Sequence, residues 1–250
     1  ITFTNKAAGE LRERLTAMLG EDGMNINAST FHSACVRILR SEIELLGYGR
    51  DFTIYDSDDS QRMIKNIMAD LDIPEKQLAP RAALSEISFA KDKMITPAEM
   101  LENAGMDYRK KITARIYGAY QERMKSANAL DFDDILCLTA ELFNRFPDVL
   151  EKYRNRYKYI MVDEYQDTNH VQFTLVSQLS AGHRNLCVVG DDDQSIYKFR
   201  GADIGNILGF ENIFEEAKVI RLEQNYRSTQ TILNAANSVI SHNNGRKPKS

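Results

Sequence analysis

The sequence has few cysteines, few histidines and no apolar run of membrane-spanning length among its 250 residues. Cys35, Cys137 and Cys187 stand far apart, so they predict neither a disulfide framework nor a zinc site. The four scattered histidines likewise predict no metal cluster. The first residues show no signal-peptide pattern. We therefore expect a reducing, cytoplasmic location and no membrane association.

The formal net charge of -4 gives no general sign of a nucleic-acid binder. It excludes none either, because local basic or aromatic surface decides such binding. With 43% hydrophobic residues, the chain can bury the cores of two domains. It begins at Ile1, inside a predicted strand and without Met, and it ends shortly after a helical pattern. We expect it to be a piece of a longer protein.

Apolar runs typical of buried strands alternate with segments of helical periodicity. Helices are predicted from Asn5 onward and from Phe31 to about Leu46. Between about Phe52 and Pro147 apolar residues recur every three or four positions, which predicts an all-helical block. The predicted strands are Ile1–Thr4, Ile26–Thr30, Tyr159–Val162, Leu186–Val189 and Lys218–Leu222. Strands on both sides of a helical block indicate an α/β domain with a parallel sheet and an inserted helical domain.

Two adjacent carboxylates, Asp163 and Glu164, follow the predicted strand Tyr159–Val162 directly. Ligands of open parallel sheets bind beyond the carboxyl ends of the strands. Asp163 can hold Mg²⁺ there, and Glu164 can orient or deprotonate a water molecule. An acidic turn without function explains an isolated Asp-Glu pair about equally well. The continuation Tyr165–Thr168 is more specific.

The segment after Val189 combines an amide with alternating aromatic and basic side chains. Gln194 offers both a donor and an acceptor, which suit a phosphate oxygen or an attacking water. Tyr197 and Phe199 alternate with Lys198 and Arg200, a pattern typical of sequence-neutral binding to single-stranded nucleic acid. A turn with two core aromatic residues is the alternative.

Other polar residues stand at predicted strand ends with weaker signals. Arg227 suits a phosphate and Tyr226 a base, although a surface Arg before a helix cap is commoner. His32 follows Thr30, and hydroxyls and helix N-termini there suit backbone phosphates, but a structural histidine is the simpler interpretation. The carboxylates of Leu130–Asp134 are best interpreted as a helix cap.

The order and spacing of six segments resemble the superfamily-one DNA helicases of the UvrD/Rep/PcrA kind, with the PcrA type closest. The similarity runs essentially from end to end. The segments are Thr2-Phe-Thr-Asn-Lys-Ala-Ala8, Thr30-Phe-His-Ser33, Leu130-Asp-Phe-Asp-Asp134, Val162-Asp-Glu-Tyr-Gln-Asp-Thr168, Gly190-Asp-Asp-Asp-Gln-Ser-Ile-Tyr197 and Leu222-Glu-Gln-Asn-Tyr-Arg-Ser228.

This resemblance implies a RecA-like motor domain of the P-loop NTPase class, interrupted by an inserted all-helical domain. The implied limits are 1–53 and 148–227 for motor domain 1A, 54–147 for domain 1B, and 228–250 for the start of motor domain 2A. The implied activity is ATP-dependent translocation on single-stranded DNA with duplex unwinding in repair or replication. The implied ligands are ATP, Mg²⁺, single-stranded DNA and single/double-strand junctions, bound by a monomer.

The resemblance also implies individual roles. Asp163 matches the Mg²⁺-associated acid and Glu164 the catalytic base. Gln194 matches the γ-phosphate contact, Arg227 an arginine finger and Tyr226 the residue that stacks on adenine. The implied DNA-binding residues are Phe3, Thr4, Asn5, Thr30, His32, Tyr197, Phe199 and Arg200.

Two departures from the family pattern matter. No Gly-x-x-x-x-Gly-Lys-Ser/Thr phosphate loop occurs in the sequence, because the resemblance places that loop before Ile1. Phe199 stands where close relatives have Trp, which reduces the stacking area. We therefore expect this chain alone to be inactive.

Two other functional classes remain open at this point. A two-metal nuclease would use Asp163, Glu164 and the carboxylates of Asp191–Asp193. It leaves Gln194, Tyr226 and Arg227 without a role. A binding module built on a decayed helicase fold would explain the missing phosphate loop if Ile1 were the native N-terminus, but the intact set of motif residues argues against decay.

Overall fold

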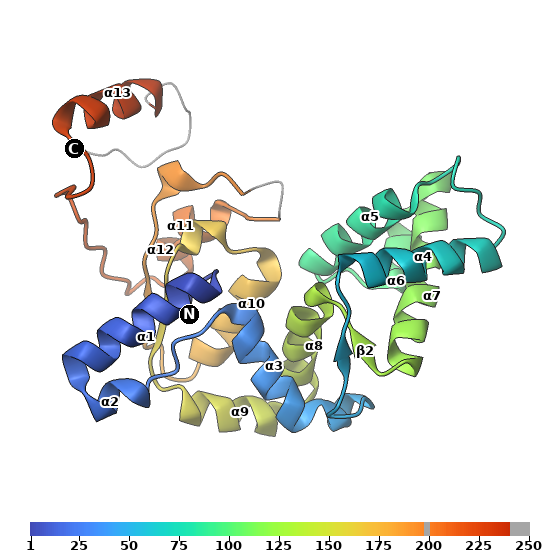
Figure 1. Cartoon of the computed structure of the whole chain (residues 1–250), viewed down its shortest axis with the longest axis horizontal. Helices are drawn as coiled ribbons and strands as arrows, with labels where there is room; N and C mark the ends of the chain where they lie inside the picture. The colour runs from blue at the N-terminus through green and yellow to red at the C-terminus, as the bar shows by residue number, and fades with distance from the viewer. Residues whose placement is uncertain (198–200, 241–250) are drawn as a thin grey trace.

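The computed structural model describes residues 1–197 and 201–240 (Figure 1). Short strands and short 3-10 helices are interspersed among the α-helices. The strands are β1 (Thr53–Ile54), β2 (Ala129–Leu130), β3 (Ile160–Val162) and β4 (Leu186–Val188), and the 3-10 helices are η1 (Ile43–Leu46), η2 (Tyr165–Asp167) and η3 (Asp192–Gln194). The α-helices are α1 (Asn5–Leu19), α2 (Glu21–Met24), α3 (Phe31–Glu42), α4 (Ser57–Asp70), α5 (Pro80–Asp92), α6 (Pro97–Asn103), α7 (Tyr108–Ser126), α8 (Phe132–Arg145), α9 (Pro147–Arg156), α10 (His170–Ser180), α11 (Gly205–Leu208), α12 (Phe210–Ile213) and α13 (Gln230–Ile240).

A small parallel sheet is centred on β3. It pairs with β4 in the register Ile160↔Leu186 to Val162↔Val188. On its other side, the Asp163 N–H donates to the Ile1 carbonyl at 3.0 Å. A parallel bridge then joins Thr2 to Thr30. Because these segments run parallel, their carboxyl ends meet at one edge of the sheet.

The predicted strands Tyr159–Val162 and Leu186–Val189 are confirmed as β3 and β4. The predicted strand Lys218–Leu222 is wrong. The side chains of Ile220 and Leu222 are 73% and 87% exposed, and no strand within the described ranges pairs with the segment. A run of apolar residues forms a strand only where a neighbour takes up its backbone hydrogen bonds. For the same reason Ile26–Thr30 forms a single bridge rather than a full strand.

The side chains form two hydrophobic cores. The first joins β3 with α3, α8, α9 and α10. The second lies within α4, α5 and α7, on the right of Figure 1. The strands β1 and β2 connect the two cores and pair as Thr53↔Ala129 and Ile54↔Leu130. The region from 52 to 147 is therefore not purely helical as predicted, and α8 packs with the sheet core.

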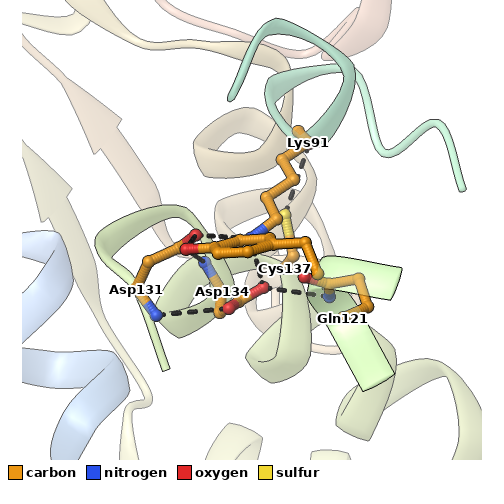
Figure 2. Close-up of polar contacts among 6 residues, drawn as sticks. Lys91, Gln121, Asp131, Asp134 and Cys137 are labelled. Carbon is orange, nitrogen blue, oxygen red and sulfur yellow. Dashed lines mark hydrogen bonds and ion pairs between the residues drawn. The ribbon is translucent and has the colours of Figure 1, made fainter. Parts of the chain in front are cut away.

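A buried ion cluster connects α5 of the second core to the start of α8 (Figure 2). Lys91 Nζ lies 2.7 Å from both Asp131 Oδ2 and Asp134 Oδ1. The Tyr120 hydroxyl donates to Asp131 Oδ2 at 2.9 Å, and Gln121 Nε2 donates to Asp134 Oδ1 at 3.2 Å. Asp131 is also the N-cap of α8, since its side chain accepts from the Asp134 N–H at 2.8 Å. The helix-cap prediction for this segment is confirmed.

The three charged groups of this cluster stabilise one another against burial. Burial disfavours the charge of Lys91, but Asp134 and Asp131 outweigh it and hold the pKa of Lys91 well above its usual value. Burial raises the pKa of Asp134 to about 6 despite the nearby Lys91 charge. Burial acts to raise the pKa of Asp131, but the charge of Lys91 and the hydrogen bonds from Lys91, Asp134 and Tyr120 together lower it below its usual value. The single positive charge of Lys91 therefore neutralises the two negative charges of Asp131 and Asp134 only in part.

Candidate functional site

The acid pair lies at the carboxyl end of β3. The Asp163 side chain is half-buried, and its Oδ1 accepts from the Glu164 N–H at 3.0 Å. Glu164 is exposed and has a left-handed backbone conformation, with φ of 51°. That conformation costs a non-glycine residue roughly 1–3 kcal/mol, and it persists where the surroundings enforce it. The turn therefore presents both carboxylates at the edge of the sheet.

Gln166 connects this turn to the segment after β4. Its side chain is buried, with 1% of its surface exposed. Nε2 donates to Glu164 Oε2 at 2.8 Å, and Oε1 accepts from the Asp191 N–H at 3.0 Å. A Cβ at Gly190 would lie 2.5 Å from Gln166 Oε1, so only glycine leaves room there. We did not predict a role for Gln166, and its place within Tyr165–Thr168 was the only signal in the sequence.

Gln194 ends η3, close to the same connection. Its Nε2 donates to Asp191 Oδ2 at 2.8 Å. The backbone N–H of Gln194 donates to the Asp191 carbonyl at 3.0 Å. Asp163, Glu164 and Gln194 therefore belong to one network, through Gln166 and Asp191.

Tyr226 and Arg227 lie apart from that network. Asn225 Oδ1 accepts from the backbone N–H groups of Arg227 and Ser228, each at 2.9 Å. The Tyr226 side chain is 92% exposed. Over the described residues, no hydrogen bond or ion pair joins Arg227 to Asp163, and the following helix α13 lies away from the body of the molecule (Figure 1). Convergence of Arg227 on the acid pair stays a prediction.

Several predicted DNA-binding residues line one open groove of about 440 Å³. It lies at the carboxyl ends of the segments that bridge at Thr2 and Thr30, so it shares the sheet edge with the acid pair. Its lining residues are Phe3, Asn5, Thr30, His32, Ser33, Val36, Ile54, Phe132 and Ile135.

Thr4 and Thr30 also have structural roles as N-caps. The Thr4 side chain accepts from the Ala7 N–H at 3.1 Å and so starts α1. The Thr30 side chain accepts from the Ser33 N–H at 3.2 Å and starts α3. Both helix N-termini thus point toward the edge where phosphates would be favoured.

His32 and Phe132 form the aromatic part of the groove. Their ring centroids lie 5.6 Å apart at 64°. Burial lowers the pKa of His32, and a hydrogen bond with the Phe132 backbone opposes the shift only in part. Phe132 is 54% exposed although it begins α8. We missed Phe132 because the carboxylates on either side of it indicated only a helix cap.

The remaining predicted DNA-binding residues follow Gln194. The Tyr197 side chain is 38% exposed and does not line the groove. Its carbonyl accepts from the Ala202 N–H at 3.3 Å. Phe199 and Arg200 lie outside the described residues.

The acid pair fits a magnesium–nucleotide site better than an all-protein metal site. Mg²⁺ is commonly held by one or two carboxylates together with substrate phosphates. Throughout residues 1–197 and 201–240, no group of three or more His, Cys, Asp or Glu side chains is placed to hold a metal ion. Asp163 can serve as the single protein ligand of such an ion.

Comparison with known proteins adds to this geometry. A family model described as "UvrD/REP helicase N-terminal domain" matches residues 1–215. The chain belongs to this family. Two relatives, from Staphylococcus aureus and Staphylococcus epidermidis, are both named ATP-dependent DNA helicase PcrA. Each is 51% identical over 249 residues, which is 100% of this chain and 34% of the relative.

Membership of the UvrD/REP family confirms the resemblance predicted from the six segments. It also confirms the α/β class with small parallel sheets. The chain spans about a third of the length of the two PcrA relatives. Within the described part, no helix has the length and apolar character needed to cross a membrane.

Proposed function

We propose that this chain supplies the first motor domain of an ATP-dependent DNA helicase of the PcrA type, which translocates on single-stranded DNA and unwinds duplex in repair or replication. The observation that carries the proposal is the shared sheet edge. One part of that edge holds Asp163, Glu164 and Gln194 in a single network. The other part is the groove lined by Phe3 and His32.

At the nucleotide part of the edge, Asp163 holds Mg²⁺ and Glu164 accepts a proton from the attacking water. Bound Mg²⁺ and ATP supply the reactive phosphate and the charge that neutralises its oxygens. Gln194 contacts the γ-phosphate. Arg227 and Tyr226 act as arginine finger and adenine contact from the other wall of an interdomain cleft. Both side chains are exposed and α13 lies apart from the body of the molecule, which leaves them accessible to a nucleotide in such a cleft.

At the DNA part of the edge, bases stack on Phe3 while phosphates contact the N-termini of α1 and α3. Tyr197, Phe199 and Arg200 are further DNA contacts by their match to the family pattern; Tyr197 does not line the groove, and Phe199 and Arg200 lie outside the described residues. His32 is uncharged near neutral pH because its pKa is lowered, so it favours stacking over ion pairing. Asn5, Thr4 and Thr30 complete this track. Phe132 adds an exposed ring to the same groove.

The domain organisation follows the same proposal. Residues 1–53 and 148–227 form a RecA-like domain 1A, 54–147 form domain 1B, and 228–250 begin domain 2A.

The protein acts as a monomer at single/double-strand junctions. All three cysteines are free, which suits the reducing cytoplasm.

A two-metal nuclease is not favoured by the geometry. It requires two metal ions about 4 Å apart, held by several shared carboxylates. Over residues 1–197 and 201–240 no such group of three or more ligands gathers.

The test compares the full-length protein with this chain alone. The full-length protein should show DNA-stimulated ATP hydrolysis, and Glu164→Gln should abolish it without loss of folding. Residues 1–250 alone contain no phosphate loop and should show negligible hydrolysis, because positioning contributes roughly 7–11 kcal/mol to such barriers. A full-length protein without DNA-stimulated hydrolysis would overturn the proposal. Metal-dependent DNA cleavage without ATP would instead support a nuclease.

A further inference from the structure

We propose that Gln166 is a positioning residue that holds the Glu164 carboxylate and links it to the segment that carries Gln194. This inference rests on the proposed function, because it concerns how the same site works. The geometry behind it involves two hydrogen bonds of one buried side chain. One reaches Glu164 Oε2 at 2.8 Å and the other comes from the Asp191 N–H at 3.0 Å.

Only a primary amide of this length can make both bonds. The bond to Glu164 requires a donor, and the bond from Asp191 requires an acceptor. A carboxylate at position 166 would keep the acceptor and place a negative charge beside Glu164. A thioether of similar length would fill the space without either bond. The two substitutions therefore separate the donor and acceptor functions.

The neighbouring residues fix the position of the Gln166 side chain. Its side chain is 1% exposed, and a buried amide must satisfy its polar atoms within the protein. On the Asp191 side, the backbone of Gly190 passes so close that a Cβ would meet Gln166 Oε1 at 2.5 Å. The absence of a side chain at Gly190 therefore leaves the space that the Gln166 amide occupies.

The backbone of Glu164 explains why such a support is needed. Its φ of 51° is unfavourable for a residue with a Cβ, and its side chain is exposed. An exposed glutamate on a strained turn would otherwise sample many rotamers. The Gln166 amide selects the one in which Oε2 accepts its hydrogen bond. A shift of that segment on nucleotide or DNA binding would then be transmitted to the base through Asp191.

The first experiment measures hydrogen exchange of single amides by NMR, without nucleotide. In Gln166→Met, the Asp191 amide should exchange at least tenfold faster than in the unchanged protein. In Gln166→Glu, it should remain protected because a carboxylate still accepts its hydrogen bond. The Tyr157 amide, bonded to the Tyr153 carbonyl at 2.9 Å at the end of α9, is the internal reference in both. Unchanged exchange of the Asp191 amide in Gln166→Met would overturn the inferred link.

The second experiment measures steady-state ATP hydrolysis of the full-length protein with saturating single-stranded DNA. Both variants should lower kcat by about 100-fold, the usual effect of a misplaced catalytic group, while KM for ATP changes less than about twofold. A purely structural defect would instead lower the melting temperature and the active fraction together.

The matched control is Gln178→Glu on α10. Its amide donates to Asn144 Oδ1 at 2.6 Å, away from the acid pair, so kcat should be retained. If the unchanged protein hydrolyses ATP and Glu164→Gln abolishes this, yet Gln166→Glu keeps full kcat, then Gln166 does not position the base. If the unchanged protein lacks DNA-stimulated hydrolysis, the proposed function itself fails.

Discussion

Replacement of Lys91 by methionine should destabilise the protein strongly. The Lys91 side chain is 1% exposed and lies 2.7 Å from carboxylate oxygens of both Asp131 and Asp134. Methionine fills a similar volume but leaves two buried carboxylates without a cation. Removal of one partner from a buried ion pair costs about 3–5 kcal/mol, because the remaining charge is uncompensated. We expect a loss in that range in the free energy of unfolding at pH 8.

The loss should depend on pH in a defined direction. Burial already raises the pKa of Asp134 to about 6 in the presence of Lys91, and removal of the ammonium raises it further. A carboxyl group with a raised pKa binds more protons in the folded state than in the unfolded state. The free energy of unfolding of the variant therefore falls as the pH rises from the pKa of Asp134 in the unfolded state to its higher pKa in the folded state. The difference in the free energy of unfolding between the variant and the unchanged protein should be smaller at pH 5 than at pH 8.

The assay is urea-induced unfolding followed by circular dichroism at both pH values. Lys65→Met is the control, since the ion pair of Lys65 with Glu75 at 3.0 Å is exposed and is expected to contribute less than about 1 kcal/mol. Addition of Asp134→Asn to Lys91→Met should recover part of the lost stability, because it removes one of the two uncompensated carboxylate charges. A loss below about 1 kcal/mol at pH 8, or a loss independent of pH, would refute the reasoning.

Three further predictions concern the edge of the sheet and its support. Burial raises the pKa of Asp92 to about 7, so Asp92→Asn should stabilise the protein at pH 8 and much less at pH 5, as thermal melts will show. Solvent screening of this half-buried group limits the gain to about 1 kcal/mol. Gly190→Ala should cost about 1–3 kcal/mol in urea unfolding, because its Cβ meets Gln166. Phe132→Ala should leave stability within about 0.5 kcal/mol and weaken single-stranded DNA binding by about 1–3 kcal/mol in fluorescence titrations.

The sequence predicts those elements whose signals are local. The helix that begins at Asn5 is confirmed as α1, with the Thr4 side chain as its cap. The apolar runs before Asp163 and Gly190 are confirmed as β3 and β4. The run Lys218–Leu222 has the same local pattern but finds no partner strand within the described ranges. A strand pattern states what a segment prefers, whereas pairing depends on what lies beside it.

The parts of the site that we missed depend on contacts between distant residues. Lys91 lies 40 positions before Asp131, and its burial follows only from the packing of α5 on α8. Gln166 stands 25 positions before Asp191, and its function depends on which way a single amide points. Phe132 lies between carboxylates whose capping role is local, while its exposure depends on the neighbouring groove. No periodicity in the sequence encodes such directions.

The end of α5 joins these separate observations. Lys91 contacts the cap of α8, the helix that begins with Phe132 in the groove. The next residue, Asp92, accepts a hydrogen bond from Asn169 Nδ2 at 2.6 Å, and Asn169 caps α10 directly after the loop that carries Gln166. Two consecutive side chains of one helix thus hold the groove and the acid-bearing loop. Because buried ion pairs and caps tolerate little displacement, a movement of the helical block would shift both parts of the edge together.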